Sequence, residues 1–321
     1  MNPDGFLADI ETIPRTLMGL AESLAAQSLP LDQVLAAPSV LLLGMGSSGY
    51  AAGVAAARLR SNGYSAVAEL ASSELLPPPH PDLLVIAVST SGESAETVAA
   101  ARRYAGRCPV VAVTDAPGSA VTEGAQTVLP LLAGPESGGV ACRSYRHTLA
   151  VLLALADRLS PGTAPTVADA CRRAADATTD LLDRRGSWLN DASELLGGPN
   201  GTWVVGPAAR LASAQQSALM LREGPRRGAQ SCETGDWSHV DVYLTKTLDY
   251  RMLFFPGSPY DDELLRWTAD RRSVVVSVGA TVAGAQLTLG YPGDDNRDVA
   301  LLTDTTVAEL VAHHWWAAGS N

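Results

Sequence analysis

The chain has 321 residues, of which 46% are hydrophobic and 18% are charged, and its formal net charge is -11 at pH 7. This composition excludes a disordered chain, and the length suits two domains better than a single core. The acidic balance disfavours a nucleic-acid surface and provides no long-range attraction for an anionic ligand. Any affinity for phosphate must therefore come from local amides, hydroxyls and helix ends.

The cysteines have neither paired nor metal-ligand spacing, and they lie at Cys108, Cys142, Cys171 and Cys232. We therefore expect reduced thiols of a cytoplasmic protein. The first residues lack the basic region and apolar core that are typical of a secretion signal, and no apolar run is long enough to cross a bilayer, so we expect no membrane partner.

The first half of the sequence alternates between strand-like and helix-like segments. Apolar residues at three- and four-residue steps over residues 4–27 predict an amphipathic helix, despite Pro14. Between Ser39 and about Asp157 we expect strands at 40–44, 65–70, 83–88, 109–114 and 127–132. Such alternation predicts right-handed βαβ units, with a parallel sheet between two layers of helices.

The second half repeats this pattern after a break at residues 161–165 and a helical connection at 166–196. We expect a strand at 202–206, a long helix ending at Glu223, strands at 250–255, 273–278 and 285–289, and a last helix at 305–317. The sequence thus predicts an α/β protein of two three-layer domains with parallel sheets. Residues 1–160 would form the first domain, and residues 161–321 the linker helix and the second domain.

Two turns rich in serine and glycine directly follow predicted strands of the first half. They are Gly44-Met45-Gly46-Ser47-Ser48-Gly49 and Ser89-Thr90-Ser91-Gly92-Glu93-Ser94. Glycines let a ligand approach the backbone closely, and the N-terminus of a helix attracts anions. Because ligands of parallel sheets bind at the carboxyl ends of strands, we predict that both turns hold one phosphate group. In the second half, the turn after the predicted strand 202–206 lacks the hydroxyls of the first turn, so no phosphate is expected there.

The first turn also allows a different interpretation. Gly44, Gly46 and Gly49 satisfy the G-x-G-x-x-G pattern of nicotinamide-dinucleotide sites, and Glu69 lies at the end of the next strand. A dinucleotide explains neither the serines inside this turn nor the second turn, so a phosphosugar is favoured. A tight turn without any ligand is disfavoured by the hydroxyl side chains of both turns.

Several stretches resemble the sugar-isomerase (SIS) family, and double-SIS proteins in particular. This family includes the isomerase domain of glucosamine-6-phosphate synthase, related phosphosugar isomerases and aminosugar-phosphate deaminases. The Ser89–Ser94 turn matches the family's Ser-x-Ser-Gly-Glu-Thr loop and is the most specific of the stretches. The others are Ile10-Glu11-Thr12-Ile13-Pro14, Gly46-Ser47-Ser48, Ser72-Ser73-Glu74 and Ala218-Leu219-Met220-Leu221-Arg222-Glu223.

The resemblance implies roles for particular residues. The sugar phosphate would be bound by Gly46, Ser47, Ser48, Ser89, Thr90, Ser91 and Ser94. Glu223 would be the catalytic base, and His239 lies where the family's ring-opening histidine falls. The resemblance also implies a homodimer with the active site at its interface. The implied reaction is isomerisation or deamination of a hexose or aminohexose phosphate through an enediol-type intermediate, without metal or organic cofactor.

The same comparison reveals departures from the family pattern. Met220 replaces a lysine one turn before the glutamate, and Arg143 replaces the lysine of a loop that resembles Glu-x-Gly-Val-Ala-Ser-Thr-Lys. The sequence ends at Asn321, soon after its last helix, where the family has a tail with a catalytic lysine. A phosphosugar-binding protein without catalysis is therefore the leading alternative. A DNA-binding regulator is disfavoured, because no basic helix-turn-helix segment precedes the first domain.

The residues themselves make Glu223 a reasonable base. Isomerisation needs one base that reaches both C1 and C2, and a carboxylate with a raised pKa can serve. Gly224-Pro225 should end the helix directly after Glu223, where the negative end of the helix dipole raises the pKa of a carboxyl group. Without this role, Glu223 would be a surface residue at a helix end, and His239 a hydrogen-bonded structural residue.

Overall fold

The computed structural model describes the chain except for residues 35, 160–165 and 320–321. Its contacts divide the chain into two compact units. The first-sheet unit comprises Thr16–Pro135 and Arg143–Arg172, and the second-sheet unit comprises the described residues of Met1–Arg15, Glu136–Cys142 and Arg173–Asn321. The predicted break at 161–165 lies outside the described residues, and the domain boundary placed there stays a prediction.

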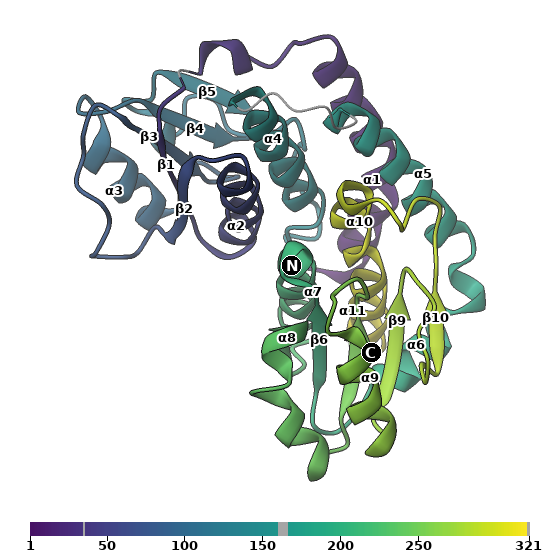
Figure 1. Ribbon diagram of the computed structural model, residues 1–321. Coiled ribbons are helices and arrows are strands. Elements are labelled where there is room, and N and C mark those ends of the chain that lie inside the picture. The colour runs from purple at the N-terminus through teal and green to yellow at the C-terminus, as the bar shows by residue number, and fades with distance from the viewer. Residues whose placement is uncertain (35, 160–165, 320–321) are drawn as a thin grey trace. The chain divides into compact units, whose positions relative to one another are not determined.

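The first-sheet unit contains a parallel sheet in the order β2-β1-β3-β4-β5 (Figure 1). The strands are β1 (Ser39–Gly44), β2 (Ser65–Leu70), β3 (Leu83–Val88), β4 (Val110–Thr114) and β5 (Thr127–Pro130). The helices that flank them are α2 (Gly46–Ser61), α3 (Ala95–Tyr104) and α4 (Arg143–Leu159). All strands predicted for this half are confirmed, with small differences at their ends.

Strands β1 and β3 lie in the interior of this sheet, and this position explains their sequences. Every residue of β3 is buried, as is every residue of β1 after Ser39. Strands covered on both faces show such continuous apolar runs instead of alternation. On one face, Leu43 and Val85 pack in a cluster with Tyr104 of α3, while the alanine-rich helix α2 packs against α4.

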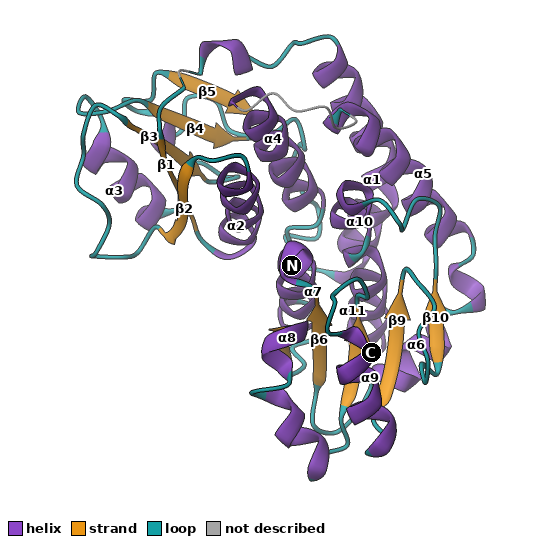
Figure 2. Cartoon of the chain, viewed as in Figure 1, coloured by secondary structure: helices purple, strands orange, loops and turns teal. Residues whose placement is uncertain are grey.

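The second-sheet unit also contains a five-stranded sheet whose pairings are all parallel (Figure 2). Its strand order, β7-β6-β8-β9-β10, corresponds strand by strand to β2-β1-β3-β4-β5 of the first sheet. Its strands are β6 (Thr202–Gly206), β7 (Ala229–Glu233), β8 (Arg251–Phe254), β9 (Val274–Val278) and β10 (Leu287–Leu289). Its helices are α6 (Leu189–Leu196), α7 (Leu211–Glu223), α8 (Thr234–Trp237), α9 (Asp261–Asp270), α10 (Arg297–Thr303) and α11 (Thr305–Gly319). The α/β class with two parallel sheets and flanking helices is thus confirmed.

Two long helices contribute residues to both units. Helix α1 (Pro3–Ala25) is divided after Arg15, and α5 (Val167–Asp183) is divided after Arg172. Helix α5, a short 3-10 turn (Arg185–Ser187) and α6 replace the single helical segment expected at 166–196. Among the described residues, no helix combines the length and the apolar composition needed to cross a membrane.

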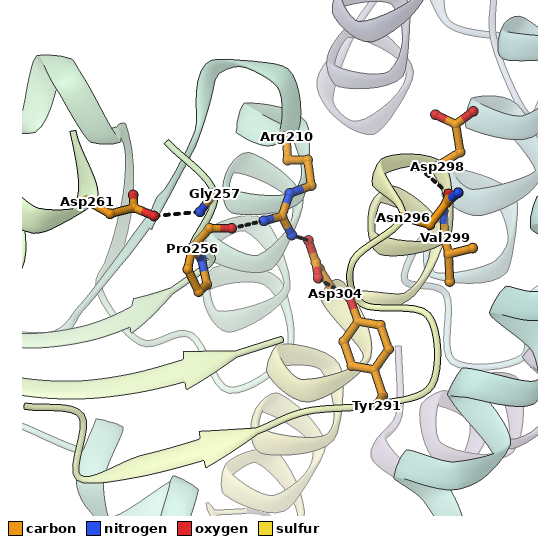
Figure 3. Close-up of polar contacts among 9 residues, drawn as sticks. All are labelled: Arg210, Pro256, Gly257, Asp261, Tyr291, Asn296, Asp298, Val299 and Asp304. Atoms are coloured by element: carbon orange, nitrogen blue, oxygen red, sulfur yellow. Dashed lines mark hydrogen bonds and ion pairs between the residues drawn. The ribbon is translucent and has the colours of Figure 1, made fainter. Parts of the chain in front are cut away.

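A buried ion pair closes the carboxyl edge of the second sheet (Figure 3). Arg210, in the 3-10 turn after β6, donates a hydrogen bond to Asp304 Oδ2 at 2.6 Å and another to the carbonyl of Pro256. The hydroxyl of Tyr291 donates to Asp304 Oδ1 at 2.5 Å. Asp304 is fully buried and Arg210 is 8% exposed, so this network joins the turns after β6 and β8 to α10 and α11.

Replacing Arg210 with methionine should lower the free energy of unfolding by about 3–5 kcal/mol, because Asp304 would stay buried without its cation. Denaturant unfolding followed by circular dichroism measures the loss. Arg102→Met is the control, since the Arg102–Glu123 pair is 57% and 62% exposed and should contribute less than ~1 kcal/mol. Equal losses in the two variants would contradict a special role for the buried pair.

Candidate functional site

The two turns rich in serine and glycine lie side by side at the carboxyl edge of the first sheet. Strands β1 and β3 pair directly and in parallel, with Leu43 opposite Ala87. Their carboxyl ends therefore point to the same edge, and the residues that follow Gly44 and Val88 are neighbours. This adjacency, expected from the sequence, is a property of the first-sheet unit alone.

The N-terminus of α2 presents backbone N–H groups at this edge. Met45 is the N-cap residue, and its side chain makes no capping hydrogen bond. Gly46 has a positive φ of 50°, which turns the chain from β1 into the helix. The first turn of α2 contains no acidic residue, so its N–H groups and positive dipole end are compatible with an anion.

Helix α3, which follows the second turn, has a different N-terminus. Ser94 caps it, because the Ser94 Oγ accepts a hydrogen bond from Thr97 N at 3.4 Å. The Ser94 hydroxyl also donates to Glu96 Oε2 at 3.0 Å. Hydrogen bonds from the backbone and from Ser94 lower the pKa of Glu96, so this helix end already carries a carboxylate. Of the two helices, α2 thus offers the better anion site.

The remaining hydroxyls of the two turns differ in exposure. Ser47, Ser48 and Thr90 are half-buried, Ser89 is buried at 4% exposure, and Ser91 is exposed. The Ser91 Oγ accepts a hydrogen bond from Glu93 N at 3.3 Å, which keeps the turn closed. The predicted phosphate ligands therefore lie in one unit, on the two neighbouring turns that follow β1 and β3.

Glu223 lies in the second-sheet unit, at the last position of α7. Gly224 ends this helix as the sequence predicts, with its N–H bonded to Met220 O at 3.3 Å. The side chain of Glu223 is half-buried. Burial raises its pKa, the negative charge of Glu136 raises it further, and Arg222 opposes the shift. This direction is the one that a carboxylate base at neutral pH requires.

A loop from the middle of the sequence packs against the helix that carries Glu223. Gln216 Nε2 donates to the carbonyl of Ala141 at 2.7 Å and contacts Met220 Sδ at 3.6 Å. Gln216, Met220 and Glu223 are spaced so that they share one face of α7. The Glu136–Cys142 loop therefore lies along the face that ends in Glu223.

Two further hydrogen bonds hold the Glu136–Cys142 loop in place. Glu136 Oε1 accepts a hydrogen bond from Cys142 N at 2.7 Å, and Gly138 N donates to Asp9 Oδ2 at 2.7 Å. A Cβ atom on Gly138 would lie 2.5 Å from the backbone of Phe6, so this close approach to α1 requires glycine. The sequence indicated this loop by resemblance. Its hydrogen bonds to Gln216 and Asp9 join positions far apart in the chain, so no local sequence pattern predicts them.

His239 is exposed and follows α8, at the carboxyl edge of the second sheet. Helix α7 starts at that edge and crosses back, so Glu223 lies near the amino edge, where β7 begins. With strands of this length at 3.3 Å per residue, the two edges are roughly 15 Å apart. Glu223 and His239 of one chain are therefore not brought together.

The segment before His239 begins with an ordered carboxylate. Glu233 is the last residue of β7, and its carboxylate accepts hydrogen bonds from Gly235 N and Asp236 N. The sequence analysis missed β7 because the strand lies at a sheet edge and contains only two buried residues, Ala229 and Cys232. Within the described parts of the chain, no cluster of His, Cys, Asp or Glu side chains has the arrangement of a metal site.

His147, on α4 of the first-sheet unit, is a histidine that the sequence analysis did not consider. Its Nδ1 lies 2.8 Å from the carbonyl oxygen of Leu131, and the side chain is fully buried. Burial lowers the pKa of His147 to about 4, so the ring is neutral at physiological pH. This residue fastens α4 to the end of β5 and provides no proton near neutrality.

Comparisons with known proteins identify a family that matches the part of the chain containing both turns. The SIS domain family matches residues 34–158, which include both turns. The glutamine--fructose-6-phosphate aminotransferase [isomerizing] of Methanosarcina acetivorans is 29% identical over 169 residues. That alignment covers 50% of this chain but 27% of the enzyme, so the chain corresponds to a minor part of that relative.

Solved structures resemble the chain over almost its whole length. The C-terminal domain of glucosamine-fructose-6-phosphate aminotransferase from Francisella tularensis superimposes with a TM-score of 0.82 at 14% identity, covering 98% of this chain and 96% of that one. The tagatose-6-phosphate ketose/aldose isomerase from Escherichia coli gives a TM-score of 0.80 at 20% identity, covering 99% and 93%. At these identities the likeness establishes the fold alone. Both sheets lie within the matched part of the chain.

The raised pKa of Glu223 leads to a pH-dependent difference in stability. Above the ordinary value of 4.5, the unfolded chain loses this proton while the folded chain still holds it. The folded state then binds more protons, so its stability falls as pH rises through this window. Glu223→Gln should remove this loss, and the variant should gain stability relative to the unchanged protein from pH 4.5 upward. Denaturant unfolding across this range measures the difference, and a constant difference would contradict the raised pKa.

Proposed function

We propose that the chain binds a phosphorylated hexose or aminohexose and moves a proton between its C1 and C2, because residues 34–158 match the SIS domain family. The observation that supports this best is the adjacency of the turns after β1 and β3. Neither turn contains lysine or arginine, so within the two turns amides and hydroxyls would bind the phosphate. The uncapped N-terminus of α2 supplies both kinds of group.

In this proposal the phosphate ligands are Gly46, Ser47, Ser48, Ser89, Thr90, Ser91 and Ser94. Ser94 would serve mainly by ordering the start of α3, because its hydroxyl already caps that helix. The other hydroxyls can donate to phosphate oxygens while the N–H groups of α2 face the negative charge.

Glu223 is the carboxylate that we assign to proton transfer. In the ketose-to-aldose direction it would remove a proton from C1, and the electron pair would form the enediol as the C2 carbonyl oxygen gains a proton from water. Glu223 would then return its proton to C2, while the C1 hydroxyl gives its proton back to water. Its raised pKa suits both steps, since one group must act as base and then as acid.

His239 is proposed to open the cyclic sugar, and this role requires a second copy of the chain. Within one chain, His239 and Glu223 lie at opposite edges of the second sheet. In a homodimer, the exposed segment after α8 could complete the partner's site. This segment exposes the large apolar side chains of Val240 and Tyr243, at 55% and 60%, which a partner would cover.

Reduced, buried cysteines favour a cytoplasmic location.

A phosphosugar-binding protein without catalysis is the second candidate. Met220 is completely buried at the position where the resembling isomerases have a lysine. A buried thioether cannot replace an ammonium group in polarising a sugar carbonyl. Binding and proton transfer must therefore be tested separately.

Binding is tested by ligand-induced stabilisation. Fructose 6-phosphate at about a hundred times its dissociation constant should stabilise the protein by ~2.7 kcal/mol, whereas NADH should have no effect.

Ser89→Ala should weaken sugar-phosphate binding about tenfold through the loss of one charge-assisted hydrogen bond. Ser258→Ala is the control, because Ser258 lies in the corresponding turn of the second sheet. Stabilisation by NADH alone would favour the dinucleotide alternative.

Proton transfer is tested by exchange of solvent deuterium into C1 or C2 of the bound sugar phosphate. The unchanged protein should catalyse this exchange, and Glu223→Gln should slow it by roughly 10²–10⁴-fold. Equal rates in both proteins would remove Glu223 from the role of base. Binding without exchange in the unchanged protein would favour the non-catalytic candidate.

A further inference from the structure

The rear side of the Ser89–Ser94 turn is bonded to the segment that follows β4. Asp115 N donates to the carbonyl of Thr90 at 3.0 Å, and Thr114 Oγ1 donates to the same oxygen at 3.2 Å. Val121 N donates to the carbonyl of Gly92 at 2.9 Å. Two carbonyl oxygens of the turn are thus held toward residues 114–121. Carbonyl dipoles facing a phosphate would repel it, so this arrangement favours anion binding on the other side of the turn.

Gly92 brings the turn into direct contact with this segment. Its φ is +71°, and a Cβ atom at this position would lie 1.8 Å from Ser119 Oγ and 3.1 Å from Thr114 Oγ1. Both the backbone conformation and the lack of space therefore require glycine here. The turn and residues 114–121 behave as one packed structure.

Glu93 forms the outer connection between the same two segments. Ala120 N donates to Glu93 Oε1 at 3.2 Å. Ala120 begins a short 3-10 turn (Ala120–Thr122), and its N-cap residue, Ser119, makes no side-chain capping bond. Glu93 thus supplies from the opposite segment the cap that Ser119 does not provide.

We propose that Glu93 is a positioning residue, which holds the Ser89–Ser94 turn in its anion-binding conformation by capping the Ala120–Thr122 turn. This inference rests on the proposed function, because it assigns to the turn a phosphate ligand. Glu93 carries a negative charge one residue from Ser94 and would repel a phosphate if its side chain faced the ligand. Its hydrogen bond to Ala120 N keeps that charge on the rear side.

The test uses a series of variants at Glu93. Glu93→Ala should remove the cap and speed hydrogen–deuterium exchange of the Ala120 amide about tenfold in the protein without ligand. It should also weaken fructose 6-phosphate binding about tenfold in titration calorimetry. Glu93→Gln keeps an acceptor oxygen and should largely restore both properties. Glu123→Gln is the control and should change neither, because Glu123 follows the same 3-10 turn, pairs with Arg102 and does not bond to Ala120 N.

The outcomes separate this proposal from the proposed function. Faster exchange at Ala120 in Glu93→Ala with unchanged binding would overturn the positioning role and leave the sugar-phosphate site intact. Weaker binding in Glu93→Gln equal to that in Glu93→Ala would show that an acceptor oxygen at this position does not restore binding, and it would also overturn the proposal. If the unchanged protein binds no sugar phosphate, the proposed function fails, and the role of Glu93 fails with it.

Discussion

Two turns can share one anion only when the strands that precede them are neighbours, and β1 and β3 are paired in parallel from Ser39 and Leu83 onward. This pairing depends on burial, because nearly every side chain of both strands is enclosed between helices. A shift in register or the insertion of a strand between them would separate the turns. The candidate phosphate site is thus a consequence of core packing, with the chemistry added in the residues after each strand.

An acidic chain that binds an anion needs positive potential within a few ångströms. The first turn of α2 provides it through the positive end of the helix dipole and its backbone N–H groups, and Gly44 allows the close turn that places them there. A Cβ atom on Gly44 would lie 2.9 Å from the backbone of Gly49 and Ser48. Screening at physiological ionic strength weakens the repulsion from distant carboxylates, whereas these dipoles act at contact distance.

The sequence predicted the first sheet well because its interior strands are apolar throughout and its turns contain glycine at defined positions. It failed at β7, whose outward-facing Gln230 and Ser231 are typical of an exposed edge, and at α9, which begins with acidic residues and not with an apolar stripe. It pointed to Glu223 by resemblance and by the helix end at Gly224-Pro225, and to the Glu136–Cys142 loop by resemblance alone. Their contact through Gln216 and Ala141 joins positions far apart in the sequence, and no local pattern encodes such a contact.

The second sheet explains why the same topology need not produce a second phosphate site. The turn after β6 contains Arg210, whose guanidinium is occupied by Asp304 and by the carbonyl of Pro256. The turn after β8 has amides that resemble those of an anion site, but Asp261 Oδ2 already accepts from Gly257 N at 2.6 Å and Ser258 N at 3.2 Å. In this sheet, the chain's own carboxylates take the positions that a ligand's oxygens would need. Serine in the first half and charged residues in the second thus distinguish two similar edges. In the second sheet, Asp304 pairs with Arg210, and Asp261 accepts from the amides of Gly257 and Ser258, whereas for the first sheet we propose a ligand in the corresponding place.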